Sequence, residues 1–246
     1  MAELDTEGLQ TGDANAPRLK LGEVGTTGLL VSNKQILEES RKELRWPAAI
    51  KTYKDMGKDA TISSAINLFK MMVSRTEWKV VPPKNATPDQ EKKAAFIQQC
   101  MNDMDHSWYD FMQNVASSYT YGFSVHEKVY RKRYKGSGSR YDDGLVGWKK
   151  LPIRSQDTIS GWIFDETGRD LIGVEQDLSL VNNYGRYSNL AAANNGNSIT
   201  IPRKKFMLFR VNPERDNPEG NSLLKTVYLS WKYRTAIEEQ EAIGIV

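Results

Sequence analysis

The stretch that decides the fold is residues 201–246, IPRKKFMLFRVNPERDNPEGNSLLKTVYLSWKYRTAIEEQEAIGIV, where a strand pattern passes through a turn into a long helix pattern. The strand is predicted at 206–211, and the Asn-Pro-Glu-Gly sequence at 217–220 is typical of a turn. A helix of about six turns is predicted over Asn221–Ile243, because its interior lacks Gly and Pro and its first residue or Ser222 can cap it. We therefore expect one continuous helix at the end of this stretch.

Working back along the chain, three helix patterns precede a strand-rich block. Asp59, Thr87 and Ser107 each stand before apolar residues at helical spacing and can cap a helix. We expect helices at 59–75, 87–104 and 107–122, and strands at 78–81, 123–129, 146–151, 162–164, 171–176, near 199 and at 206–211. Helices followed by strands predict an α+β fold with a mostly antiparallel sheet, rather than alternating βαβ units.

Composition divides the chain into three parts. Residues 1–33 are rich in Gly, Thr, Asp and Ala without apolar periodicity, which predicts a flexible N-terminal arm. Residues 34–216 carry the helix and strand patterns and are predicted to form one α+β domain, with a polar surface loop at 179–198. Residues 217–246 hold the turn and the long helix.

Composition also excludes several classes of site. The chain has 246 residues, a net charge of +3 and a mean hydropathy of -0.59, values typical of a water-soluble globular protein. With one cysteine, Cys100, and two histidines, it can form neither an intrachain disulfide nor a thiolate or His-rich metal site. No run approaches the roughly 18 apolar residues of a membrane span, and no signal-peptide core is present. We expect a cytosolic product with no cofactor and no membrane contact.

One cluster has the residue types for acid–base or metal chemistry: Asp103, Asp105, His106 and Asp110. His106 and Asp110 would stand one turn apart on a helix. The competing interpretation places the first two carboxylates in a polar joint between helices and Asp110 in a first helical turn, where a negative charge favours the helix dipole. His126 is expected to be a structural histidine on a strand. Because no phosphate-binding loop or activated nucleophile accompanies the cluster, we predict that the chain is not an enzyme.

The densest basic run lies at Lys128–Lys135. Such a run can contact nucleic-acid phosphates, or it can be a solvated face. Because glycines follow it, we predict an exposed strand end and turn over 128–140. Three basic side chains there are predicted to be largely solvated: Arg131, Lys132 and Arg133.

Three segments, taken together, resemble the portal proteins of tailed bacteriophages. They are YKDMGKDATISSAINLFKMMVSRTEWKVVPP at 53–83, YGFSVHEKVY at 121–130, and the stretch 201–246 quoted above. The last is the most specific, since a strand, an Asn-Pro-Glu-Gly turn and a long helix with Tyr and Trp occur in order. The resemblance covers roughly residues 45–246. It implies the N-terminal part of a portal wing followed by the start of the first stem helix, with the clip, second stem helix and crown absent from the chain.

The resemblance implies a ring subunit, in a dodecamer, that forms the head–tail connector channel at one capsid vertex for packaging and ejection of double-stranded DNA. The implied partners are further copies of the chain, the major capsid protein, the terminase large subunit, a head-completion adaptor and double-stranded DNA. Contacts to DNA are expected to be non-specific and directed at its backbone. The protein is then expected in the virion, after assembly in the host cytoplasm.

The resemblance also makes the predicted helix after residue 221 a stem helix between neighbouring subunits. Its apolar arc is wider than packing on a single core requires. Subunit-interface contacts are expected from Leu223, Leu224, Val227, Tyr228, Trp231 and Ile237. Charges near the DNA path or the next subunit are expected at Lys232, Arg234, Glu238, Glu239 and Glu241. The sequence leaves open which of these two surroundings the charges meet.

Two alternative functions belong to other classes. One is a metal-dependent nucleic-acid enzyme that uses the cluster at 103–110, and the other is a nucleic-acid-binding module built on the basic run at 128–135. Metal-dependent DNA cleavage would favour the first, and tight, salt-sensitive binding by a monomer would favour the second. A closed ring with neither property favours a portal.

Overall fold

The computed structural model describes residues 25–179 and 198–244. Its helices are α1 (Ala49–Met56), α2 (Ala60–Arg75), α3 (Pro88–Asn102), α4 (Trp108–Val115), α5 (Ser118–Tyr121) and α8 (Leu224–Gly244), with 3-10 turns η1 (Lys42–Leu44), η2 (Gln156–Thr158) and η3 (Arg203–Lys205). Its strands are β1 (Val31–Ser32), β2 (Gln35–Ile36), β3 (Phe123–Glu127), β4 (Val129–Lys132), β5 (Val146–Lys150), β6 (Ile153–Arg154), β7 (Ile159–Phe164), β8 (Leu171–Asp177), β9 (Ser198–Pro202) and β10 (Phe206–Arg210). The predicted arm is described only from residue 25, and the predicted loop at 179–198 lies, except for its two end residues, outside the described residues.

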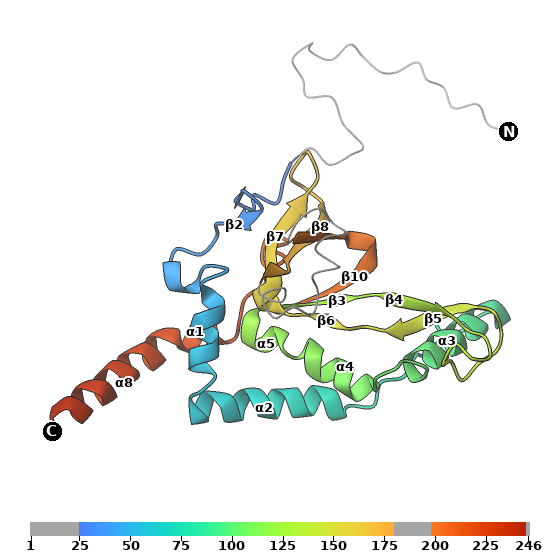
Figure 1. Cartoon of the computed structure of the whole chain (residues 1–246), viewed down its shortest axis with the longest axis horizontal. Helices are drawn as coiled ribbons and strands as arrows, with labels where there is room; N and C mark the ends of the chain where they lie inside the picture. Colours follow the sequence, from blue (N-terminus) through green and yellow to red (C-terminus); the bar gives the residue numbers. More distant parts are fainter. Residues whose placement is uncertain (1–24, 180–197, 245–246) are drawn as a thin grey trace, which may run out of the picture.

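The strands form several small antiparallel sheets, and the fold is α+β as predicted. The sheet orders are β1–β2, β4–β5, β10–β3–β6 and β7–β8–β9. The single sheet that we expected is therefore divided. Lys128 interrupts the chain between β3 and β4, and η2 separates β6 from β7, so that consecutive strands turn toward different partners. In Figure 1 the β7–β8 hairpin stands above β3 and β6, while α2, α4 and α5 lie below them.

Packed aromatic rings join the sheets to the segment that precedes α1. The Phe123 ring meets Trp46 edge-on at 4.9 Å between centroids and Trp162 at 5.0 Å. Such edge-to-face contacts add to the gain from burying the rings. The remaining members of this core are Ile36, Ile50, Val125, Ile159, Val174, Ile201 and Phe206.

Two further cores hold the helices. One lies among η1, α1, α2 and the start of α8, and its buried members are Leu44, Ala49, Tyr53, Met56, Ile66, Leu224 and Tyr228. The other packs α4 against the sheet of β3 through Met104, Phe111, Met112, Val115 and Leu151. The first of these cores therefore positions α8.

The predicted helix starts are confirmed by their hydrogen bonds. The Asp59 carboxylate accepts from the Thr61 and Ile62 backbone N–H groups at 2.9 and 3.0 Å and begins α2. Capping boxes begin the next two long helices: Thr87 with Gln90 at α3, and Ser107 with Asp110 at α4. These local signals fix where each helix begins because they satisfy backbone donors that the helix leaves unpaired.

Other local predictions were wrong. Residues 78–81 form no strand: the Trp78 indole donates to the Val73 carbonyl, and the Val80 N–H donates to the Gln98 side chain. Without a partner strand, such an extended segment stays a connection. The predicted helix over 107–122 is divided into α4 and α5, and the predicted helix from Asn221 begins at Leu224.

Candidate functional site

Helix α8 is the candidate site, and backbone hydrogen bonds join the residues just before it to the rest of the chain. The Asn221 N–H donates to the Val211 carbonyl at 2.7 Å, and the Leu223 N–H donates to the Tyr119 carbonyl at 3.0 Å. The buried Ser222 hydroxyl donates to the Thr120 carbonyl and accepts from the Leu224 N–H at 3.0 Å, which confirms Ser222 as the capping side chain. The entry of α8 is thus attached to both α5 and the end of β10.

Two glycines allow the turn before α8 to approach the end of α5. A Cβ added at Gly122 would lie 2.4 Å from the Glu219 carbonyl oxygen, and one added at Gly220 would lie 2.5 Å from the Gly122 carbonyl oxygen. Both residues have positive φ, 92° and 56°. No other residue type fits both the space and this backbone conformation. The close contact between Gly122 and Gly220 therefore helps to set the orientation of α8 relative to the rest of the chain.

One side of α8 is buried within its own chain. Leu224 and Tyr228 are only 2% and 3% exposed, packed among η1, α1 and α2, and Trp231 is half-buried against the same core. We expected these three residues to contact neighbouring subunits. The first two instead anchor the helix internally.

Charged pairs extend this anchor along the helix. Glu43 accepts from the Tyr228 hydroxyl at 2.8 Å and from the Lys232 ammonium at 3.1 Å. Its own backbone N–H, followed by these two donors, lowers the pKa of Glu43 to about 2. Arg234 pairs with Asp59, the residue that caps α2, and with Glu238 at 3.3 Å, one turn along α8. The cations of Lys232 and Arg234, expected at a DNA path or at a neighbour, thus have partners within the chain.

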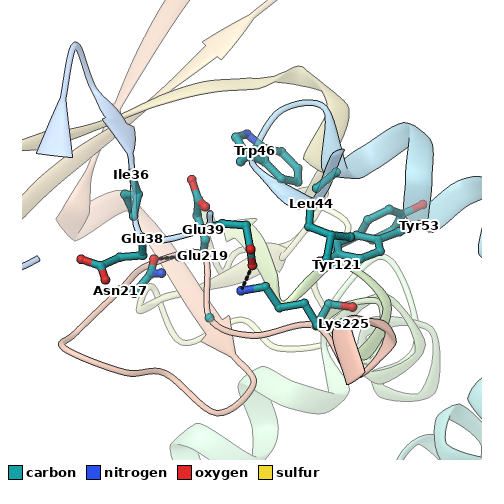
Figure 2. A pocket seen from close by; sticks show the side chains of 13 residues that line it. Ile36, Glu38, Glu39, Leu44, Trp46, Tyr53, Tyr121, Asn217, Glu219 and Lys225 are labelled. Atoms are coloured by element: carbon teal, nitrogen blue, oxygen red, sulfur yellow. Dashed lines mark hydrogen bonds and ion pairs between the residues drawn. The ribbon is translucent and has the colours of Figure 1, made fainter. Parts of the chain in front are cut away.

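A small cavity of about 30 Å³ lies where the segment before α1 meets the turn at 217–220. Figure 2 shows Glu39 and Lys225 paired across it, at 2.8 Å, with Glu219 beside them. The Glu219 carboxylate accepts from the Trp162 indole N–H at 3.2 Å. Burial raises the pKa of Glu219 to about 7. A carboxyl group that titrates near neutrality therefore sits at the base of α8, and no sequence motif indicated it.

The other side of α8 is exposed. Val227 and Ile237, both predicted interface residues, are 41% and 55% exposed, and Tyr233 and Ile243 are more exposed still. The predicted acidic residues Glu238, Glu239 and Glu241 are exposed as well, and Leu223 is half-buried. In Figure 1 the helix extends from α1 away from the sheets to the C-terminal end of the drawn chain. Most of its second half is therefore uncovered.

The acidic cluster considered for metal or acid–base chemistry is not assembled. Asp103 accepts from the Ser139 hydroxyl and the Arg140 N–H, each at 2.7 Å, and pairs with Arg131 at 3.3 Å. Asp105 also pairs with Arg131, at 2.7 Å, while Asp110 serves the capping box of α4. Within residues 25–179 and 198–244, no group of three or more His, Cys, Asp or Glu side chains could hold a metal ion. The carboxylates at 103 and 105 instead neutralise a buried arginine.

The prediction that the basic run is solvated was wrong at two of three positions. Arg133 is fully buried, bonded to Asp143 at 2.7 Å and to Gln99 at 2.9 Å. Its guanidinium lies 4.1 Å from the centre of the Tyr141 ring, a cation–π contact. The Arg131 side chain is also almost covered, whereas Lys132 is exposed as predicted. Strand alternation turns residues 131 and 133 inward toward acidic partners.

His126 is a structural histidine, as expected. It is fully buried, its Nδ1 lies 3.2 Å from the Leu151 carbonyl oxygen, and its ring contacts Phe111 and Phe209 edge-on. Burial lowers the pKa of His126 to about 4, so the ring is neutral near pH 7. It supports the packing of α4 on β3.

None of the helices in the described residues combines the length and apolar character needed to cross a membrane. A comparison with curated proteins gave no match. A comparison with protein families matches residues 50–239 to the family described as portal protein of Mu bacteriophage. The matched range begins within α1 and ends within α8, so it includes the sheets formed by β3 to β10, while β1, β2 and η1 lie before it. The chain belongs to this family of bacteriophage portal proteins.

Proposed function

We propose that the chain is a subunit of a portal ring at one capsid vertex, through which double-stranded DNA is packaged and ejected. The observation that carries this proposal is the family match, which extends from within α1 to within α8. The exposed side of α8 supports it, because a ring subunit must present lateral surfaces to two neighbours. We place the protein in the virion, after assembly in the host cytoplasm.

Within this proposal, residues 34–216 form the wing and residues 217–246 begin the first stem helix. The stem helix contacts neighbouring subunits through its exposed apolar side chains, chiefly Val227 and Ile237, while Leu224 and Tyr228 hold it to its own wing. A dodecamer is the proposed assembly. Further partners are the major capsid protein, the terminase large subunit and a head-completion adaptor.

Contacts with DNA are proposed to be weak and directed at the phosphate backbone, since base-specific contacts would hold the duplex in place. Among residues 25–179 and 198–244, the only ion pair of these three glutamates, Glu238, Glu239 and Glu241, is the one that Glu238 makes with Arg234. Their carboxylates are available either to repel the DNA phosphates or to contact charged residues of a neighbouring subunit. The alternative of a metal-dependent nucleic-acid enzyme is not favoured, because Arg131 already pairs with Asp103 and Asp105.

The proposal is tested by measuring the assembly mass of the full polypeptide that carries this chain, by native mass spectrometry and negative-stain imaging. We expect closed rings, and a polypeptide that remains monomeric at micromolar concentration would contradict the proposal. Changing Val227 and Ile237 to Asp should then abolish rings without changing the unfolding midpoint. The matched control is Val81→Asp, because Val81 is 79% exposed on the connection after α2. Rings of normal yield from the Val227/Ile237 variant would refute the stem assignment.

A further inference from the structure

Two basic runs that are far apart in the sequence, at 128–135 and 203–205, lie side by side in the folded chain. The Lys128 N–H donates to the Lys205 carbonyl at 2.7 Å, and the Lys205 ammonium lies 5.6 Å from the centre of the Tyr130 ring. The pairing of β3 with β10 brings them together, because the end of β3 lies opposite the start of β10. Strand β4 continues from β3 (Figure 1) and pairs with β5. Residues of β4, β5 and η3 therefore share one region of the surface.

The two faces of the β4–β5 hairpin have different surroundings. Arg131 points toward the acidic residues after α3 and is almost covered. Opposite it, a Cβ added at Gly147 would lie only 3.4 Å from the Cys100 sulfur of α3, so this face is packed. Tyr130 and Lys132 alternate with Arg131 along the strand, and both are exposed. The hairpin thus turns one face toward α3 and leaves the other open to solvent.

The positive charge of this region is not compensated within the chain. Neither β4, β5 nor η3 contains a carboxylate. The nearby Glu127 pairs with Arg154, and Asp105 pairs with Arg131. We define the basic surface as the cations of these segments that have no ion-pair partner among residues 25–179 and 198–244: Lys128, Lys132, Lys149, Lys150, Arg203, Lys204 and Lys205.

This surface differs from the positions at which the sequence suggested contact with DNA. On α8, Lys232 pairs with Glu43 and Arg234 with Asp59, so an approaching phosphate would have to compete with an internal carboxylate. The cations of the basic surface meet no such competition. Unpaired cations gathered on one face attract a polyanion more strongly than the same charges paired or scattered.

The residue types indicate which kind of polyanion fits. Nearly all the cations are lysines, whose ammonium groups act as point charges without a fixed geometry, whereas arginine binds carboxylates in a preferred two-bond arrangement. Double-stranded DNA presents one phosphate for about every 1.7 Å of its axis, a dense and regular charge. Lysines can contact such phosphates without fixing the register, which suits a duplex that must keep moving.

We propose that the basic surface on β4, β5 and η3 binds the phosphate backbone of double-stranded DNA, without preference for sequence. This inference rests on the proposed function, and it assigns the DNA contact of the subunit to the β4–β5 hairpin and η3 rather than to α8. Contacts of this kind are weak individually and are lost as salt displaces them.

The test is the fluorescence anisotropy of a short labelled duplex added to rings of the full polypeptide, between about 50 and about 200 mM salt. Lys132→Gln/Lys205→Gln should weaken binding by at least about tenfold at the lower salt concentration, and should reduce the slope of log affinity against log salt by about 2 for each subunit in contact. The matched control, Lys51→Gln/Lys84→Gln, removes the same charge at exposed lysines elsewhere and should keep the affinity within about twofold. A second duplex of unrelated sequence should bind equally well.

Unfolding midpoints in urea show whether each variant remains folded, and Lys132→Gln alone, at an exposed position, serves if the double variant is destabilised. Rings that bind no duplex, or a Lys132/Lys205 variant with the affinity and salt slope of the parent, would overturn the inference and leave the portal ring intact. Tighter binding of polyglutamate than of DNA at equal ionic strength would also overturn it, because the surface would then suit an acidic protein. Absence of rings from the unmodified polypeptide would contradict the proposed function and this inference together.

Discussion

The buried carboxyl group at the base of α8 makes stability depend on pH in a defined way. Glu219 has a pKa of about 7 in the folded chain, against an ordinary value of 4.5, because burial disfavours its charged form. Between these two values the folded state holds a proton that the unfolded state has released. The free energy of unfolding therefore falls as pH rises from 4.5 through about 7.

Replacing Glu219 with Gln removes the titration but keeps the bond to Trp162, since the amide carbonyl can accept from the indole N–H. The shift from 4.5 to about 7 corresponds to about 3 kcal/mol. Because Glu219 is half-buried as a whole, solvent screening reduces the expected gain to about 1–2 kcal/mol at pH 8. Near pH 4.5 the variant and the parent chain should be equally stable.

The assay is urea unfolding followed by tryptophan fluorescence, at pH 5, 6, 7 and 8, for the parent chain and Glu219→Gln. Subtracting the two curves removes the titration of every other group. The matched control is Glu214→Gln, because Glu214 is an exposed carboxylate on the same connection. A Glu219→Gln difference that is the same at pH 5 and pH 8, or a variant less stable at pH 8, would refute the reasoning.

Two further substitutions test the packing around the site. Arg133→Met should lower the free energy of unfolding by about 3 kcal/mol, measured in urea, because it leaves the partners of a buried cation unpaired, whereas the exposed neighbour Lys132→Met should change it by less than about 0.5 kcal/mol. Gly122→Ala should lower the free energy of unfolding by more than about 2 kcal/mol, because the added Cβ would clash with the Glu219 carbonyl oxygen and the positive φ is unfavourable for alanine. Gly136 has the same φ of 92° with open space around it, so Gly136→Ala should cost only about 1 kcal/mol; equal losses at 122 and 136 would show that the contact with the turn before α8 is unimportant.

The sequence predicted those features that depend on residues close together in the chain. Asp59, Thr87 and Ser107 begin helices because each bonds backbone N–H groups two or three residues ahead, and such a signal can be read from the sequence alone. The wide apolar arc of α8 was recognised for the same reason. Which part of that arc is buried internally depends on η1 and α1, about 180 residues earlier, and no local pattern contains that information.

The errors have the opposite origin. Arg133 is buried because Gln99, far from it in the sequence, and Asp143, across the following turn, supply hydrogen bonds and charge in the folded chain. A charge run is normally solvated, so the local rule failed where long-range partners compensate burial. The strand expected at 78–81 failed because alternation alone does not supply a partner strand. The raised pKa of Glu219 likewise arises only from its burial in the folded chain.

The second half of α8 extends away from the rest of the chain. A small change in the orientation of the helix at its base therefore produces a larger displacement at its far end. From Trp231 to Gly244 the helix spans roughly 20 Å at about 1.5 Å per residue. A tilt of about 5° at the base would move the far end by about 2 Å, whereas a gap of about 0.5–1 Å already removes a quarter to a half of the dispersion attraction in a packed contact. The close backbone contact at Gly122 and Gly220 allows little such tilt. In a closed ring, small deviations in the tilt of α8 would add up from one subunit to the next. The Gly122–Gly220 contact would limit these deviations within each chain, before the subunits assemble.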